Sequence, residues 1–301
     1  MAVRARHWFL IVLTAALFGS SFLFIKVATS EIPPLTIAAA RAGIAALIVA
    51  VAAIISGVRL PPPGRDWLVL MVIGLLTAII PYTAIAMGQR YIESALGGIL
   101  FATIPLFTVL LAPLFLPGER LTGKRIAGAL IGLVGVSAVI GPQVLASMQA
   151  QLFGTVMTVA AAASYALGGV ISRRHAHVSP MILAVGQLVT AAPVLVLVSL
   201  LFDSPWRLQP SFATLAALGA VGLIATAVPV LLFFVLIRDV GATRTSLLTF
   251  FMPVFAVLLG AVFLGERPGP FALGGLALIF AGAFLVSMQP ARPPPQTDAE
   301  P

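Results

Sequence analysis

The sequence contains no cysteine, which excludes disulfide bonds and cysteine-based metal sites or nucleophiles. Charged residues are also scarce, at 9% of the 301 residues, whereas a soluble globular domain has about 25%. Hydrophobic residues make up 60% of the chain, and the mean hydropathy is +1.14. So few charges cannot cover a water-facing surface, and the composition therefore predicts an integral membrane protein.

Long apolar runs occupy almost the whole chain, and each approaches the length of about 20 residues that a helix needs to cross a hydrocarbon core. They lack the strict apolar and polar alternation of barrel strands, so we expect helices, which satisfy their backbone polar groups internally. The expected fold class is all-α, a polytopic membrane protein of ten transmembrane helices. The predicted spans are Trp8–Ala28, Pro33–Ile55, Trp67–Met87, Ser94–Leu116, Gly123–Ile140, Leu152–Ile171, Pro180–Phe202, Ser211–Ile237, Ser246–Leu264 and Phe271–Met288.

The chain is basic, with 17 Lys and Arg residues against 9 Asp and Glu residues. In a soluble protein this excess would suggest nucleic-acid binding, but in a membrane protein it must first be compared with the positive-inside rule. If the N-terminus is cytoplasmic, most basic residues outside the spans fall inside, and only Arg90, Arg207 and Arg267 fall outside. We therefore expect a bacterial-type cytoplasmic (inner) membrane protein with both termini in the cytoplasm and no nucleic-acid partner.

One phrase near the middle of the chain returns near its end. FLPGER at Phe115–Arg120 is repeated as FLGER at Phe263–Arg267. The glutamates within the two copies, Glu119 and Glu266, are either carboxylates near a helix start, where negative charge is favoured, or a pair of gate residues. The repetition predicts that the chain is a duplicated five-helix unit.

The duplication predicts the domain organisation and its symmetry. The first repeat is expected over residues 1–150, the second over 151–289, and a disordered, proline-rich tail over 290–301. Because five is an odd number of spans, the second repeat must enter the membrane from the opposite side, which makes the repeats inverted. Inverted repeats around a central cavity underlie alternating access in many secondary transporters, so the duplication favours transport.

Four stretches carry a resemblance to a known family. They are FGSSFLFIK in the first span, PPLTIAAARAG in the second, IPLFTVLL followed by GERLTGKRIAGALIGLVGV, and the corresponding MPVFAVLLGAVFLGERPGPFALGGLALIFAG. In this order the chain resembles the EamA-type ten-helix exporters of the drug/metabolite transporter superfamily over Trp8–Met288. The resemblance implies a central cavity formed mainly by spans 1 to 4 and 6 to 9, spans 5 and 10 at the back, and export of small metabolites, amino acids above all. Phe18 and Tyr165 stand where the family often has tryptophan.

Four prolines lie at matching places in the two repeats, since Pro81 and Pro229 are 148 residues apart, as are Pro105 and Pro253. Each proline removes a backbone hydrogen bond, and at membrane depth the freed carbonyl needs a neighbouring group or cavity water. Matched interruptions are the best sequence indication of a transporter site. An ordinary kink is the alternative at each position, but two symmetric pairs favour hinges that line the cavity.

Arg41 is the charge placed most deeply within a span. It lies about 12 Å into the second span at 1.5 Å per residue, where insertion scales assign a charge a cost of about 2.5–3.5 kcal/mol. The side chain must therefore face protein or water. It either attracts a substrate carboxylate in the cavity or binds helix-end carbonyls as a structural arginine. Lys26, nearer a span end, is expected to snorkel to the interface.

Isolated polar and aromatic residues within the spans complete the predicted cavity lining. Hydrogen bonds between helices are the alternative role for the polar residues, and lipid contact is the alternative for the aromatic ones. Several of them lie within a turn of a matched proline, which favours the cavity. The set comprises Ser20, Ser21, Tyr82, Tyr165, Gln187, Thr226, Thr249, Phe101 and Phe250.

The chemistry absent from the spans limits the mechanism. No Asp, Glu or His lies well inside a predicted span, so we expect facilitated or exchange transport without a proton-coupling carboxylate. Neither a Walker-type phosphate loop nor an HExxH motif is present, so ATP hydrolysis and an intramembrane zinc protease are disfavoured.

We therefore expect a secondary transporter, and no enzyme, that exports small metabolites by alternating access. One cation among sparse neutral polar groups and aromatics favours neutral or aromatic amino acids as substrates. Nucleobases, cationic compounds or other drugs are the alternatives, followed by an intramembrane enzyme or a passive channel. The expected partners are a small-molecule substrate and the lipid bilayer, the expected state is a monomer or weak homodimer, and no cofactor or metal is expected.

Overall fold

The computed structural model of the protein describes residues 5–58, 60–62, 64–117, 119, 121–145, 148–175, 178–241, 245 and 247–287. The predicted tail over 290–301, as well as Gly118, Arg120 and Met288, lies outside the described residues. Within these ranges the chain forms helices and no strands. Eight of the helical stretches are long and apolar enough to cross a membrane, and the two shorter ones that follow, Leu248–Leu264 and Pro270–Val286, are also apolar.

Each of the ten predicted spans coincides with one helix or with a run of consecutive helices, which confirms the fold class. Pro34 and Pro180 each stand in the first turn of a helix, where their missing N–H costs nothing. The helices are α1 (Ala5–Ala28), α2 (Pro34–Ile55), α3 (Arg65–Gly74), π-helical η1 (Leu75–Ile79), α4 (Ile80–Gln89), α5 (Ser94–Phe101), α6 (Ile104–Phe115), α7 (Gly123–Leu145), α8 (Gln149–Arg174), α9 (Pro180–Phe202), the 3₁₀ turn η2 (Pro205–Arg207), α10 (Phe212–Gly222), π-helical η3 (Leu223–Ala227), α11 (Val228–Val240), α13 (Leu248–Leu264) and α14 (Pro270–Ser287).

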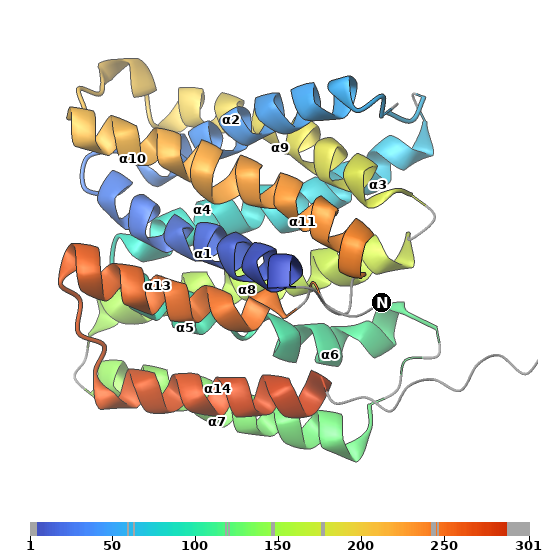
Figure 1. The fold of residues 1–301 in the computed structure, drawn as a ribbon. Helices are drawn as coiled ribbons and strands as arrows, with labels where there is room; N and C mark the ends of the chain where they lie inside the picture. The colour runs from blue at the N-terminus through green and yellow to red at the C-terminus, as the bar shows by residue number, and fades with distance from the viewer. Residues whose placement is uncertain are drawn as a thin grey trace, which may run out of the picture.

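The helices lie side by side in one bundle (Figure 1). α1 begins and α14 ends at the right-hand end of the bundle in this view, where α6 also leads to α7 and α8 to α9. α1 runs from right to left, whereas α8, the first helix of the second predicted repeat, runs from left to right. α2 and α9 likewise run in opposite directions and pack against each other at the upper edge.

The lower edge of the bundle is the pair α7 and α14, which pack closely along their lengths (Figure 1). Small residues bring the two backbones together, as is usual where helices meet in lipid. A methyl group on Gly135 would approach the carbonyl oxygen of Gly275 to 2.7 Å, and one on Gly128 would approach that of Gly282 to 2.7 Å. Spans 5 and 10 therefore form their own close-packed pair.

The four prolines fall in different local structures. Pro81 and Pro229 each follow a π-helical segment, η1 and η3 respectively, and each stands in the first turn of the next α-helix. Pro105 stands in the first turn of α6, after the chain leaves the helix at Ala102–Thr103. Pro253 instead lies within α13, which continues through it. Of the two predicted hinge pairs, the first shows the same interruption in both repeats, and the second does not.

One carboxylate joins α13 to α5 at the left-hand end of the bundle. Glu266 accepts hydrogen bonds from the backbone N–H of Ser94 (2.7 Å), the Ser94 hydroxyl (2.8 Å) and the backbone N–H of Ala95 (2.8 Å). Gly265, with φ +66°, ends α13 in the left-handed conformation and turns the chain back. A methyl group on Gly260 would collide with the Glu266 carboxylate, so the glycine leaves room for it. Glu266 thus binds the start of a helix in the other predicted repeat.

Two further carboxylates at the same end bind helix starts across the predicted repeats. Glu31 accepts from the backbone N–H (2.6 Å) and hydroxyl (3.0 Å) of Ser211, which lower its pKa. Asp203 accepts from the backbone N–H (2.7 Å) and hydroxyl (2.9 Å) of Thr36. We call these two contacts and that of Glu266 the carboxylate clasps. Each joins a residue of 1–150 to a residue of 151–289.

The other glutamate of the repeated phrase makes ion pairs. Glu119 contacts Arg125 at 2.8 Å and Arg173 at 3.0 Å. Burial acts to raise the pKa of Glu119, but hydrogen bonds and charge from these two arginines outweigh it and lower the pKa. The two glutamates therefore have different partners: a helix start for Glu266 and arginine side chains for Glu119.

Candidate substrate site

Arg41 is held in the interior of the bundle by neighbours from two other spans. Only 5% of the residue is exposed. Its Nε donates to the hydroxyl of Thr226 at 2.9 Å, and its guanidinium carbon lies 4.0 Å from the centre of the Tyr82 ring. An arginine over an aromatic face gains a cation–π attraction that grows as water is removed. The Nη1 atom is buried without a hydrogen-bond partner, so the N–H groups of this nitrogen have no acceptor.

Thr226 lies in the π-helical segment η3, and the wide turn of this segment determines which groups the Thr226 hydroxyl contacts. Its hydroxyl donates to the carbonyl of Val221, five residues earlier, at 2.7 Å, while it accepts from Arg41. π-helical turns inside α-helices are frequent at functional sites because they redirect side chains. Here the turn presents the hydroxyl to the cation.

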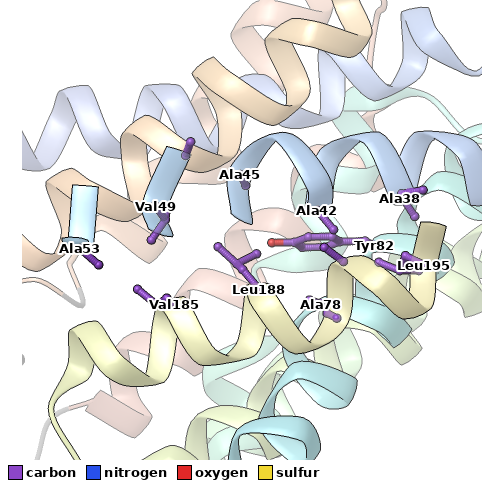
Figure 2. Close-up of a cluster of buried hydrophobic side chains, with 14 residues drawn as sticks. Ala38, Ala42, Ala45, Val49, Ala53, Ala78, Tyr82, Val185, Leu188 and Leu195 are labelled. Atoms are coloured by element: carbon purple, nitrogen blue, oxygen red, sulfur yellow. The ribbon is translucent and has the colours of Figure 1, made fainter. Parts of the chain in front are cut away.

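Tyr82 lies where α2, α4 and α9 meet. Figure 2 shows its ring between Ala42 of α2 and Leu195 of α9, with the hydroxyl end directed toward Leu188. Small residues on α2 make the approach possible: the row Ala38, Ala42, Ala45, Val49 and Ala53 faces α9.

Aromatic contacts continue from this group toward α1. Tyr165 of α8 packs against the buried cluster that contains Tyr82. Its ring meets Phe101 of α5 edge-on at 5.2 Å between ring centres, and Phe101 meets Phe22 of α1 at 5.6 Å. We call Tyr82, Tyr165, Phe101 and Phe22 the aromatic row. It includes one residue from each of α1, α4, α5 and α8, with Arg41 of α2 at one end.

The structure thus brings together five of the residues predicted to line a cavity: Arg41, Tyr82, Thr226, Tyr165 and Phe101. The remaining predicted residues are Ser20, Ser21, Gln187, Thr249 and Phe250, and three of them have contacts of another kind.

Gln187 of α9 accepts from the hydroxyl of Thr77 in η1 at 2.5 Å, a bond between two spans. Phe250 of α13 packs against Phe280 of α14, 6.1 Å between ring centres. The Ser20 hydroxyl donates to the carbonyl of Leu17 in its own helix, and Ser21 is buried in α1. Thr249 is half-buried on α13.

Lys26, expected to snorkel, instead binds the end of α4. Its ammonium donates to the backbone carbonyls of Gln89 (2.9 Å) and Ile92 (2.7 Å). These acceptors lie 63 and 66 residues away in sequence. Nearby, burial and the Glu266 carboxylate raise the pKa of Glu93, against the opposing effect of Lys26. A cation at a helix C-terminus is favoured by the helix dipole.

Sequence reasoning missed two residues of the interior, Phe22 and Gln89. Phe22 follows directly on the Ser20–Ser21 pair and is 2% exposed, so its position beside a predicted cavity residue was the available signal. Gln89 falls just beyond the predicted end of the third span at Met87, yet its side chain is fully buried.

Two hollows open elsewhere on the molecule. One, of about 380 Å³, lies between α2 and α9 and is lined by residues including Thr36, Gly43 and Ser199. The other, of about 370 Å³, is lined by Leu116, Pro117, Glu119, Arg173 and Arg174. Neither of these two includes Arg41. The central cavity expected from the sequence stays a prediction.

Two segments of the chain match one known family. The profile of the EamA-like transporter family matches residues 6–141 and again residues 152–288. The chain belongs to the EamA-like transporter family. It is therefore a multi-pass membrane transporter of the drug/metabolite transporter superfamily, and the family is one of transporters rather than enzymes.

Individual relatives of this EamA-like protein match along nearly their whole length. It is 26% identical over 282 residues to the inner membrane transporter YedA of Escherichia coli (strain K12), covering 92% of this chain and 90% of that protein. It is 27% identical over 287 residues to the "Probable amino-acid metabolite efflux pump" of Salmonella typhimurium, covering 92% and 93%. A solved crystal structure superposes with a TM-score of 0.66 at 26% identity, covering 97% of this chain and 100% of that one.

Proposed function

We propose that this EamA-like transporter exports neutral or aromatic amino acids across a bacterial-type inner membrane, with Arg41 binding the substrate carboxylate. The observation that carries the proposal is the unpaired Nη1 of a buried guanidinium. A buried donor without a partner costs about 1–3 kcal/mol, and a carboxylate would satisfy it with a charge-assisted bond. The aromatic row beside it supplies faces for an apolar or aromatic side chain.

The name of the Salmonella relative supports the substrate class, since that protein is described as an amino-acid metabolite efflux pump. A fixed cation also argues against cationic drugs, because like charges in a low-dielectric interior repel. Nucleobases and other small metabolites remain the alternative substrates.

Alternating access between two inverted repeats is the proposed mechanism. The opposite directions of α1 and α8 and of α2 and α9 in Figure 1 support it, as does the double match to one family profile. Among the described residues, acidic side chains lie in loops or at helix ends. We therefore propose facilitated or exchange transport, and flux that follows an imposed proton gradient in liposomes would contradict it.

The substrate role of Arg41 is tested by counterflow of radiolabelled amino acids in liposomes. Arg41→Gln should raise the half-saturation concentration about 10- to 100-fold, the equivalent of about 1.5–3 kcal/mol for a bond to a charged group. Arg41→Lys should fall between this variant and the wild type, because the cation remains but the planar fork is lost. Arg207→Gln, the same change at an exposed arginine in η2, is the matched control and should leave the half-saturation concentration unchanged. Equal half-saturation in Arg41→Gln and the wild type would refute the assignment.

Orientation is tested in the same cysteine-free chain. We propose that both termini are cytoplasmic, so single cysteines at Gln149 and Arg174, at opposite ends of α8, should react with an impermeant maleimide from opposite faces. Arg174→Cys should react from the cytoplasmic side.

A further inference from the structure

Gln89 stands out among the buried polar side chains. Of the described residues, two carry buried side-chain nitrogen or oxygen atoms with no hydrogen-bond partner: Arg41, through Nη1, and Gln89, through both Nε2 and Oε1. Gln89 is fully buried at the end of α4. Leaving such groups unsatisfied is expensive, and each instance in a folded protein calls for a physical reason.

The chain makes room for this amide. A methyl group on Gly97 of α5 would collide with Nε2 of Gln89 and would approach the Phe22 ring to 3.0 Å. The amide and the ring therefore flank the same glycine. The backbone carbonyl of Gln89 is separately occupied by the Lys26 ammonium, so the side chain is not needed to hold the end of α4.

Gln89 lies at the opposite end of the aromatic row from Arg41. Phe22, its neighbour across Gly97, meets the ring of Phe101, which in turn meets the ring of Tyr165. Tyr165 packs against the buried cluster that contains Tyr82, and the Tyr82 ring lies beside the Arg41 guanidinium. The buried atoms without hydrogen-bond partners thus occur at the two ends of this series of contacts.

We propose that Gln89 is a second substrate contact, which selects solutes carrying an uncharged group that can donate and accept a hydrogen bond. The inference rests on the proposed export of amino acids and narrows its substrate class. An amide offers one acceptor and two donors without charge, so it suits a hydroxyl or carboxamide at the tip of a side chain. The favoured solutes are amino acids whose side chain is long enough to carry that group to Gln89, such as tyrosine over phenylalanine, because Gln89 lies seven residues beyond Tyr82 on α4, about 10 Å at 1.5 Å per residue.

Tyrosine and phenylalanine, which differ only by the hydroxyl at the tip of the side chain, give the sharpest test. A site that hydrogen-bonds a hydroxyl discriminates against the analogue that lacks it, because the analogue leaves the protein group unpaired. Counterflow in liposomes should give the wild type a preference for tyrosine over phenylalanine. In Gln89→Leu this preference should fall about tenfold, mainly through the half-saturation concentration of tyrosine.

Gln187→Leu is the matched control. Gln187 is a span glutamine with a partner, Thr77, so its loss should lower thermal stability in detergent and leave the preference for tyrosine over phenylalanine unchanged. Gln89→Leu removes atoms that have no partner and should keep or raise the melting temperature. Gln89→Met, another apolar replacement of similar length, provides a second variant that must give the same loss of preference.

The outcomes separate the two proposals. Wild-type amino-acid counterflow with unchanged preferences in both Gln89 variants would overturn the role of Gln89 and leave the proposed function intact. Absence of amino-acid counterflow by the wild type would overturn both. If Gln187→Leu lost the preference to the same extent, any perturbation of the interior would alter selectivity. The specific role of Gln89 in substrate selection would then be refuted.

Discussion

Replacing Glu266 by glutamine tests how firmly the carboxylate clasp at α5 holds the two predicted repeats together. The variant keeps the shape of the side chain and one carbonyl oxygen but removes the charge. Three donors now bind that charge, two of them backbone N–H groups at the start of a helix. Bonds to charged groups contribute about 1.5–3 kcal/mol where neutral ones contribute about 0.5–1.5.

The loss of charge should therefore cost about 1 kcal/mol per bond, plus about 0.3–1 kcal/mol for the helix dipole. Because Glu266 is half-buried and partly screened by solvent, we expect a total of about 2 kcal/mol rather than the full sum. Ser94→Ala, which removes one of the three donors, should cost about 1 kcal/mol.

Denaturant unfolding in detergent micelles, followed by far-ultraviolet circular dichroism, measures these changes. The double variant should be less destabilised than the sum of the single ones by about 1 kcal/mol, since the hydroxyl and the carboxylate contact each other. Asp239→Asn is the control, and it should cost less because its partner, Arg238, is exposed. Strict additivity of Glu266→Gln and Ser94→Ala would show that the hydrogen bond contributes nothing.

Two further predictions concern other contacts. Because the pKa of Glu31 is lowered by Ser211, its contribution to stability is present above the unfolded pKa, near 4.5, and is lost as the pH falls through the folded value. Melting temperatures recorded from pH 6 downwards should thus fall less in Glu31→Gln than in the wild type, and parallel curves would contradict this. Gly282→Ala should destabilise the α7–α14 pair by about 1–3 kcal/mol through collision with the Gly128 carbonyl. Gly274→Ala in the same helix meets open space and should be neutral by the same unfolding assay; equal effects would refute the packing argument.

The spans could be predicted because helix length and apolarity are local properties of the sequence. The interruptions within the spans were harder to predict. Pro105 and Pro253 give the same signal, yet the chain breaks before Pro105 while α13 continues through Pro253. A proline always removes one backbone N–H, but whether the helix is interrupted there depends on the residues that pack beside it. The π-helical segments before Pro81 and Pro229 had no sequence signature beyond the prolines themselves.

Within the site, Arg41 was predictable because a charge inside a span always needs an explanation. Its partner Thr226, 185 residues away, was recognised as a polar span residue. The hydrogen bond between the two could not be predicted, because it depends on how distant spans pack together. Gln89 could not be recognised because a glutamine beyond an apolar run looks interfacial. Only the packing of α5 over the end of α4, permitted by Gly97, buries it.

The π-helical turns η1 and η3 each hold one residue more than an α-helix needs over the same length. One extra residue turns the side chains that follow by about 100° relative to an uninterrupted α-helix. Thr226 lies inside one of these turns and accepts a hydrogen bond from the guanidinium. Deleting one residue from η3 would therefore rotate the two parts of span 8 relative to each other and separate Thr226 from Arg41.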